Sequence, residues 1–311
     1  MHLLIPFASV LSDGGQHTLR TLNLPNLDAL LARMIPAETD RGDAHTLSPP
    51  HERALARAIG LAGADGELPW AAQAAADDGL DPGDLAWGLV TPAHWAAGAD
   101  GVHVVDPQAL ALDEAESREL FDALHEPFES AGWLLAWGAP LRWYAAHESL
   151  AELPTASLDR VVGRDVDAWI ARDDARMRAL RRLQNEVQML LHAHPVNAAR
   201  EARGALAVNS FWLSSCGVRQ PVERPAALRV DERLRAPALA EDWPAWRAAW
   251  QALDAGALRE ALALLDAGRD LALTLCGERT ALRLEPRPYT WWSRLSRRAR
   301  AGAAGELLET L

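Results

Sequence analysis

The 311-residue sequence contains no lysine, so all 31 of its basic side chains are arginine. Without lysine the chain cannot form a Schiff base, use a lysine as a general base, or build a phosphate loop of the Walker A type. It has only two cysteines, Cys216 and Cys276, which lie far apart and outside any CxxC pair. Their spacing excludes a disulfide-stapled scaffold and a zinc or redox site built on cysteine pairs.

Long apolar runs and an excess of positive charge are also missing. No apolar run has the length of a transmembrane helix, and the first residues lack the basic segment that begins a signal peptide. We therefore expect a cytoplasmic protein without stable membrane association. The formal net charge of -12 argues against general binding of nucleic acid, which requires a basic face. No GxSxG or GxGxxG loop is present.

Apolar strand patterns and helical patterns are mixed along the chain, which indicates an α/β protein with one large domain or two smaller ones. The pattern predicts strands over residues 3–10, 102–106, 271–277 and 281–284, and a strand or hairpin over 137–144. It predicts helices over residues 24–33, 50–61, 176–191, 243–253 and 256–265. The helix over 176–191 has an apolar face at helical spacing and leads directly into the loop at His194.

The segment from His194 to Gly217 contains a candidate ligand motif. His194, Asn197 and Arg200 are spaced three residues apart, and Asn209 follows shortly before an apolar segment. Imidazole, amide and guanidinium groups at a loop-to-helix junction suit an oxyanion. The alternative is a purely structural one, in which His194 caps a helix and Gly204 ends it.

The same pattern resembles the archaeal-type, cofactor-independent phosphoglycerate mutases of the alkaline-phosphatase-like superfamily. The sequence His194-Pro-x-Asn-x-x-Arg200, a glycine, and an asparagine entering an apolar strand that ends at Gly217 carry this resemblance. The segment Pro25–Leu30 is similar to the helix that follows the first metal-binding strand of that superfamily. The chain also resembles bacterial regulatory proteins of the RpfE type.

The resemblance implies an α/β fold with an alkaline-phosphatase-like core sheet flanked by helices and a smaller inserted α/β domain. We expect the discontinuous core in residues 1–79 and 218–290, and the inserted domain in residues 80–217. Residues 291–311 form a basic tail that carries Trp291, Trp292 and several arginines. Such a tail fits either a frayed terminus or a helix that docks on a surface.

The sequence departs from these enzymes where their catalytic groups belong. The resemblance implies two divalent metal ions held by Asp and His, and a serine nucleophile. Here the first strand is followed by no carboxylate before Asp13, His51 occupies the position of the serine, and Cys276 and Gly277 replace an Asp-His pair. Two-metal catalysis fails without its ligands. We therefore predict a catalytically degenerate protein with no metal site and no cofactor.

His51 is a weak catalytic candidate. Its imidazole could accept a phosphoryl group, with Arg53 and Arg142 neutralising the phosphate. The alternative is a residue that caps or packs at the start of a helix. Two further sets of metal-ligand types, Asp100 with His103 and Asp106, and His192 with His194, lack the fixed geometry of a helical zinc motif.

Two functions remain open at this point. In the first, a cleft between core and insert, lined by His194, Asn197, Arg200 and Asn209, binds a small phosphorylated or carboxylated metabolite and transmits its occupancy to a regulatory partner protein. In the second, a rearranged site still catalyses phosphoryl transfer or hydrolyses a phosphate ester. The missing metal ligands favour the first.

Overall fold

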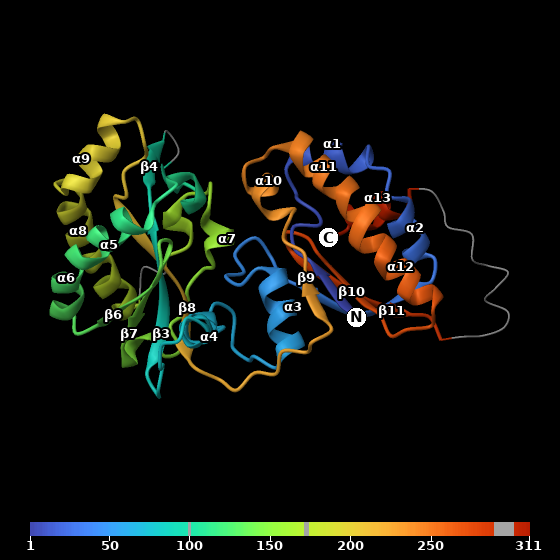
Figure 1. Ribbon diagram of the computed structural model, residues 1–311, viewed down its shortest axis with the longest axis horizontal. Coiled ribbons are helices and arrows are strands. Elements are labelled where there is room, and N and C mark those ends of the chain that lie inside the picture. The colour runs from blue at the N-terminus through green and yellow to red at the C-terminus, as the bar shows by residue number, and fades with distance from the viewer. Residues whose placement is uncertain (99–100, 171–173, 289–301) are drawn as a thin grey trace. The chain divides into compact units, whose positions relative to one another are not determined.

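The computed structural model describes residues 1–98, 101–170, 174–288 and 302–311 (Figure 1). The chain forms two compact units. The first unit consists of Met1–Ala44, Pro49–Gly60 and Glu223–Leu311. The second unit consists of His45–Ser48 and Leu61–Val222. Each unit is an α/β structure with its own sheet, so the predicted α/β class is confirmed.

The observed division differs from the expected domain boundaries. Residues 61–79, assigned above to the core, belong to the second unit, because α4 (Trp70–Asp77) packs its alanines against that unit's sheet. Residues 302–311, assigned to the tail, pack into the first unit, where Leu308 is fully buried. The aromatic and basic part of the tail lies in 289–301, outside the described residues.

A five-stranded mixed sheet forms the centre of the first unit. Its strands, in the order in which they pair, are β2 (Met34–Arg41), β11 (Thr280–Pro286), β10 (Ala272–Cys276), β1 (His2–Ile5) and β9 (Leu228–Val230). β1 pairs in parallel with β10 and β9, while β11 is antiparallel to β10 and β2. Leu3, Leu4 and Ile5 are completely buried. Their unbroken apolar run is typical of a strand covered on both faces.

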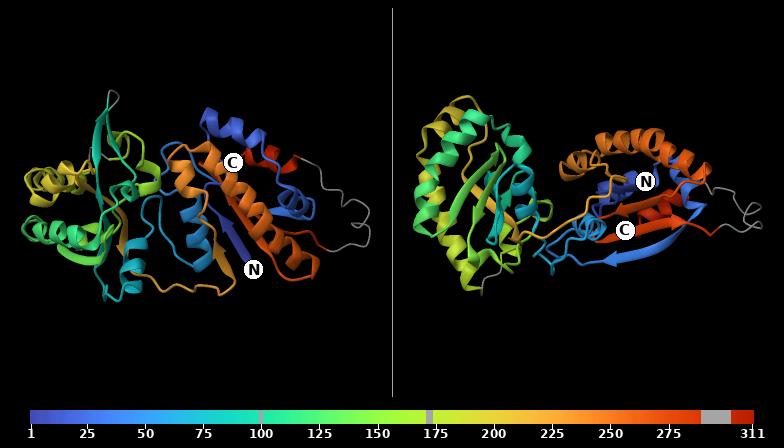
Figure 2. Two further views of the ribbon diagram at one scale, coloured as in Figure 1. Left: turned by 45° about the horizontal axis from the view of Figure 1, so that its top comes forward. Right: turned by 60° about the horizontal axis from the view of Figure 1, so that its bottom comes forward.

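Helices cover both faces of this sheet (Figure 2). Leu3, Ile5 and Leu273 face a large core shared with most of the helices, whereas Leu4 packs with Ala54 of α3 on the other face. The helices are α1 (Asp13–Arg20), α2 (Pro25–Leu31), α3 (Pro50–Ile59), α10 (Arg235–Leu239), α11 (Trp243–Leu253), α12 (Arg259–Asp266) and α13 (Ala303–Leu308), with a π-helical turn, η4 (Asp254–Leu258), joining α11 to α12.

His2, the first residue of β1, makes the stability of this unit sensitive to acid. Its Nε2 atom forms a hydrogen bond of 2.8 Å with the hydroxyl of Thr274, and it lines a small cavity beside α3. Burial, reinforced by the positive charge of Arg283, lowers the pKa of His2 to about 4, although Glu285 opposes the shift. The folded chain therefore binds a proton on His2 less readily than the unfolded chain does.

We expect the free energy of unfolding to fall as the pH is lowered from about 6.5 towards 4, because the unfolded state takes up a proton on His2 in this range and the folded state does not. Urea denaturation at a series of pH values measures this dependence. The same series on His2→Gln, which cannot titrate, should show a shallower loss of stability. Identical slopes in the two proteins would contradict the prediction.

The second unit contains a four-stranded antiparallel sheet. Its strands, in pairing order, are β6 (Leu134–Ala139), β7 (Arg142–Ala146), β3 (Ala86–Ala93) and β8 (Ser210–Val218), and a separate hairpin is formed by β4 (Trp95–Gly98) and β5 (Gly101–Val104). The helices are α4, η1 (Pro107–Leu110), α5 (Glu114–Ala123), α6 (His125–Ser130), η2 (Glu148–Leu150), α7 (Leu158–Val161), η3 (Val166–Ala168), α8 (Ala175–His192) and α9 (Pro195–Ala202).

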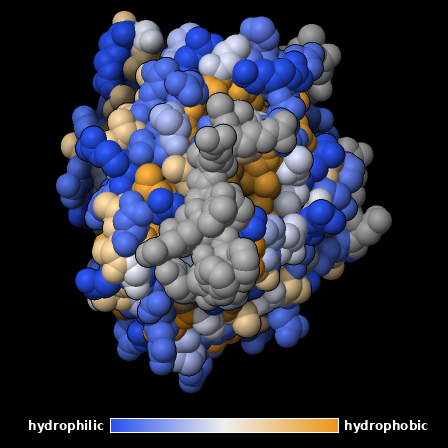
Figure 3. Space-filling model, turned by 90° about the vertical axis from the view of Figure 1, so that its right-hand side faces the viewer, coloured by the Kyte–Doolittle hydropathy of each residue, from blue (hydrophilic) through white to orange (hydrophobic). Residues whose placement is uncertain are grey.

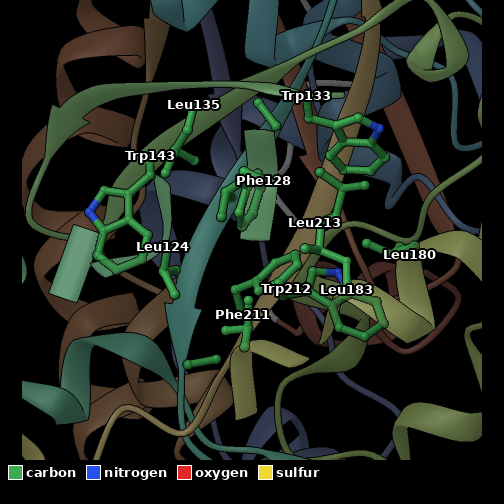
Figure 4. Packing of buried hydrophobic residues seen from close by; sticks show 14 of the residues in the cluster. Leu124, Phe128, Trp133, Leu135, Trp143, Leu180, Leu183, Phe211, Trp212 and Leu213 are labelled. Atoms are coloured by element: carbon green, nitrogen blue, oxygen red, sulfur yellow. The ribbon is translucent and has the colours of Figure 1, made fainter. Parts of the chain in front are cut away.

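Large aromatic and aliphatic side chains fill the space between this sheet and the helices α5, α6 and α8. Phe128 of α6 packs its ring 5.4 Å from that of Phe211 on β8 (Figure 4). Leu180 and Leu183 of α8 join the same cluster. Trp87 and Tyr144 point to the opposite face of the sheet, where they contact the alanines of α4. Both faces of the sheet are therefore covered, and α8 is held firmly along one of them.

The strands that differ from the sequence prediction include β1 and β2. The strand predicted over residues 3–10 ends at Ile5, because Pro6 cannot continue the ladder and Phe7 turns the chain with a positive φ of 54°. The pattern also missed β2, which is mostly exposed and contains Pro36. An edge strand tolerates both features, since it pairs only with β11.

The face of the molecule shown in Figure 3 is mostly hydrophilic, with hydrophobic surface in a few separate areas. This agrees with the strongly negative net charge of the chain. Within the described ranges, no helix combines the length and the apolar character needed to cross a membrane.

Candidate functional site

The carboxyl ends of β1 and β10 lie side by side in the first unit. The N–H of Ala8 donates to the carbonyl oxygen of Cys276 at 2.7 Å, and the N–H of Leu11 donates to the carboxylate of Glu278 at 3.0 Å. His51, near the start of α3, places its ring 5.1 Å from the ring of Phe7. The structure thus brings together the segments that follow β1 and β10 and the start of α3.

The residues at this edge do not fit the two metal ions that the resemblance implies. Among the residues that the structure describes, no group of three or more His, Cys, Asp or Glu side chains is placed to hold a metal ion. Cys276 is buried, and burial raises the pKa of its thiol, which disfavours the thiolate that a metal requires. Glu278 accepts a backbone N–H instead. We derive no catalytic step through a metal here.

Arg53 is committed to an ion pair. Its Nε and Nη2 atoms donate to the two carboxylate oxygens of Asp40 on β2, each at 3.0 Å, and Arg57 reaches the same carboxylate at 2.7 Å. Burial raises the pKa of Asp40, but the hydrogen bonds and charges of the two arginines outweigh it and hold the pKa below its usual value. The guanidinium of Arg53 thus attaches α3 to β2, and its phosphate-neutralising role stays a prediction.

Arg142 is paired in the same way in the second unit. It donates to the two oxygens of Asp78 at 2.8 and 2.6 Å, and the hydroxyl of Tyr144 donates to Asp78 at 2.6 Å. The hydrogen bond from Arg142 is the main reason that the pKa of Asp78 lies below its usual value. Arg142 therefore joins β7 to the end of α4. His51 and Arg53 belong to the first unit.

The side chain of Asn197 joins two segments of the second unit by hydrogen bonds. Its Nδ2 atom donates to the carbonyl oxygens of Leu191 (2.8 Å) and Val208 (2.7 Å), and its Oδ1 atom accepts the N–H of Val208 at 2.8 Å. The side chain is almost completely buried. It joins the end of α8 to the segment that leads into β8, and a ligand-binding role of Asn197 stays a prediction.

Arg200 is completely buried, and all three of its guanidinium nitrogens have acceptors. Nε donates to the carbonyl oxygen of Leu206 at 2.7 Å, Nη2 to that of Leu110, and Nη1 to the carboxylate of Glu116 in the first turn of α5. Glu116 also binds Arg203. Arg200 is thus the structural partner of a nearly buried carboxylate, and its binding of a ligand stays a prediction.

The other two members of the motif also have local partners. His194 caps α9, with its Nδ1 atom accepting the N–H of Val196 at 3.3 Å, as in the structural alternative considered above. Asn209 accepts the N–H of Trp95 at 2.7 Å and donates to its carbonyl oxygen at 2.9 Å. The motif His194 to Asn209 lies wholly in the second unit.

A cavity of about 810 Å³ lies in the second unit beside α8, the hairpin β4–β5 and η3. This volume falls within the range of small-molecule binding pockets. Its apolar lining consists of Trp95, Ala97, Val102, Val166, Ile170 and Met189. Its carboxamides are Gln184, Asn185, Gln188 and Asn209, and its charged or titratable groups are Asp167, Arg181 and His192. Asn209 is the member of the predicted set that lines this cavity.

Two buried hydrogen-bond donors of the cavity residues have no acceptor in the described part of the chain. They are the indole Nε1 of Trp95 and the Nε of Arg181. The Arg181 guanidinium is held in place because Nη2 donates to Asp167 at 2.9 Å. A buried donor without a partner costs about 1–3 kcal/mol.

Sequence reasoning missed this cavity. The signal was present in α8, where Arg181, Gln184, Gln188 and His192 recur at helical spacing between the apolar positions. A polar helix face is usually exposed to solvent. The sequence pattern alone therefore cannot distinguish residues that line a binding cavity from residues on an ordinary exposed surface.

No protein-family model matches the chain, and no curated protein matches it. The solved structures that are similar to the chain include the following two. The PH0037 protein from Pyrococcus horikoshii has a TM-score of 0.45 and 15% identity, covering 98% of this chain and 91% of that one. A cofactor-independent phosphoglycerate mutase from Thermoplasma acidophilum DSM 1728 has a TM-score of 0.36 and 17% identity, covering 100% of this chain and 98% of that one.

Proposed function

We propose that this protein binds a small anionic metabolite, carboxylated or phosphorylated, in the cavity beside α8, and that it acts by binding rather than by two-metal phosphoryl transfer. The observation that carries the proposal is the Arg181 guanidinium, which lines the cavity together with four carboxamide side chains. Carboxylate and phosphate oxygens are strong acceptors and make charge-assisted bonds with arginine.

The charges around the cavity favour an anion. Arg181 carries a positive charge beside the carboxylate of Asp167, and His192 adds an imidazole to the lining. A hydrogen bond to a charged group contributes roughly 1.5–3 kcal/mol. Two or three such bonds, with the burial of apolar surface, suffice for micromolar affinity. We therefore place the proposed anion site at Arg181. The guanidinium of Arg200 already binds Glu116.

A regulatory role fits this proposal. The strand ends of the first unit do not fit the two-metal centre of the phosphoglycerate mutases, while the cavity of the second unit can respond to a metabolite. We propose a cytoplasmic protein of the RpfE type that is a degenerate phosphoglycerate mutase and reports metabolite binding to a partner protein.

The substitution Arg181→Ala tests the proposed function. We expect 3-phosphoglycerate or citrate, used as probes in isothermal titration calorimetry, to bind with one site per chain. Arg181→Ala should weaken this binding about tenfold or more, because it removes a charge-assisted hydrogen bond. Arg182→Ala is the matched control: its neighbouring guanidinium is exposed and borders a different cavity, so binding should be unchanged.

Equal weakening by the two alanine substitutions, or no binding of either anion to the wild type, would count against the cavity as an anion site. Catalysis is tested in parallel with 3-phosphoglycerate and added manganese, magnesium, cobalt or zinc. Turnover in the ordinary enzyme range, about 1–10³ per second, that is lost in His51→Ala would show instead that the chain is an active mutase.

A further inference from the structure

One edge of β4 is not covered by a strand, because in the described ranges β4 pairs with β5 alone. The N–H of Val105 donates to the carbonyl oxygen of His94 at 2.9 Å, just before β4 begins, and this bond fixes which residues of the ladder bond to each other. In an antiparallel ladder every second residue turns its N–H and C=O away from the paired strand. Trp95 and Ala97 are these residues of β4, so their backbone groups point to the edge opposite β5.

The carboxamide of Asn209 places this outer edge of β4 beside the cavity. It accepts the N–H of Trp95 at 2.7 Å and donates to the carbonyl oxygen of Trp95 at 2.9 Å, as a residue of a neighbouring strand would. Asn209 and Ala97 both line the cavity, and Ala97 is exposed. Within the described part of the chain, no other group bonds to the outward N–H and C=O of Ala97. Beyond Asn209 the edge therefore offers one donor and one acceptor to a ligand in the cavity.

The cavity is long enough for an extended chain. Arg181 and His192 of α8 both line it, and the eleven residues of rise between them correspond to about 16 Å of helix. An extended chain advances about 3.3 Å per residue, so a tripeptide of roughly 10 Å fits within this length. The apolar lining, which includes Val102, Ile170 and Met189, suits apolar side chains on such a ligand.

A peptide backbone is the chemical group that matches this edge. A residue in an extended chain presents its N–H and C=O on the same side, in the arrangement that pairs with the C=O and N–H of Ala97. Peptides that add a strand to an exposed sheet edge gain affinity from such main-chain hydrogen bonds and selectivity from side-chain pockets. Citrate and 3-phosphoglycerate carry carboxylates and hydroxyls but no amide, so they cannot form this pair of bonds.

We propose that the ligand is a short free peptide, which adds as an extended strand to the outer edge of β4 and places its C-terminal carboxylate at Arg181. This inference rests on the proposed function and identifies its ligand class. The central residue of a bound tripeptide donates its N–H to the carbonyl oxygen of Ala97, and its own carbonyl oxygen accepts the N–H of Ala97.

Calorimetry with three probes tests this assignment: the tripeptide Val-Ala-Val, the same tripeptide methylated on its central nitrogen, and citrate. We expect Val-Ala-Val to bind with one site per chain and more tightly than citrate. The methyl group removes the donor that pairs with the Ala97 carbonyl oxygen, so the methylated peptide should bind at least about tenfold more weakly.

Variants at position 97 provide the matched comparison. Ala97→Pro removes the outward N–H, which the ladder with β5 does not use, and proline is tolerated at such edge positions. The preference for Val-Ala-Val over citrate should fall about tenfold in this variant. Ala97→Gly keeps the N–H and should retain the preference, and Arg182→Ala should not alter it. Circular dichroism and thermal unfolding verify that each variant is folded.

The outcomes separate this inference from the proposed function. If citrate binds and Arg181→Ala weakens it, but Val-Ala-Val does not bind or binds no better than its methylated form, the proposed function stands and the strand-addition inference is wrong. Equal affinity of Ala97→Pro and Ala97→Gly for Val-Ala-Val would also contradict the inference. If neither citrate, 3-phosphoglycerate nor the peptide binds to the wild type, both proposals fail.

Discussion

Replacing Arg200 by alanine is expected to destabilise the second unit by about 3–5 kcal/mol, the usual cost of breaking a buried ion pair by removing one partner. Arg200 is completely buried, and its guanidinium satisfies the carbonyl oxygens of Leu206 and Leu110 together with the carboxylate of Glu116. Its removal leaves these acceptors without their donor and opens a cavity at the junction of α9 with α5. Urea denaturation followed by circular dichroism measures the loss.

Arg203→Ala is the control for this experiment. Arg203 binds the same carboxylate, but its side chain is 51% exposed, so water can replace it. Exposed ion pairs contribute about 0–1 kcal/mol, and we expect a loss in that range. A loss of less than 1 kcal/mol for Arg200→Ala, or weakened anion binding in that variant while its stability is unchanged, would show that Arg200 serves the ligand after all.

Hydrophobic periodicity predicted the long elements well, because their burial pattern follows one simple geometry. The helix predicted over residues 176–191 is α8, Ala175–His192, and the one predicted over 243–253 is α11. The strand over 271–277 and its antiparallel partner are β10 and β11. Each of these elements buries one face or both, so its apolar residues repeat with the period of a helix or fill a strand.

The candidate site could be predicted less well, for a physical reason. A His, Asn or Arg in a motif has the same chemistry whether its partner is a ligand or a backbone carbonyl. The sequence of the motif could not show that Leu110 and Glu116, more than 80 residues before Arg200, supply the acceptors of its guanidinium. Tertiary contacts between distant segments decide which polar side chains are already satisfied.

The same argument explains why the cavity escaped prediction. Its polar residues come from α8, η3 and the start of β8, and its tryptophan comes from β4. Most of them lie on α8, where they look like an ordinary polar helix face, and the other elements contribute only one or two groups each. What distinguishes Trp95 and Arg181 is that their buried donors have no acceptor in the described ranges, which is a property of the fold.

The second large loss of stability is expected when Asn197 is replaced. Asn197→Leu removes one acceptor and two donor bonds that satisfy Val208 and Leu191, and the buried backbone groups left without partners each cost about 1–3 kcal/mol. We expect the second unit to lose about 3 kcal/mol or more, measured by urea denaturation. Asn185→Leu is the control, since Asn185 is exposed on α8.

A second variant at the same position separates lost hydrogen bonds from altered packing. Asn197→Asp keeps the size and shape of the side chain, but an ionised carboxylate cannot donate to the carbonyl oxygens of Leu191 and Val208, and it would repel them. Burial raises the pKa of such a carboxyl in the folded state, so the folded chain binds the proton more readily than the unfolded chain. Asn197→Asp should therefore be strongly destabilised at pH 7 and regain part of its stability relative to wild type as the pH falls towards 4. Wild-type stability of Asn197→Asp at pH 7 would mean that the three hydrogen bonds of Asn197 do not hold α8 to the start of β8.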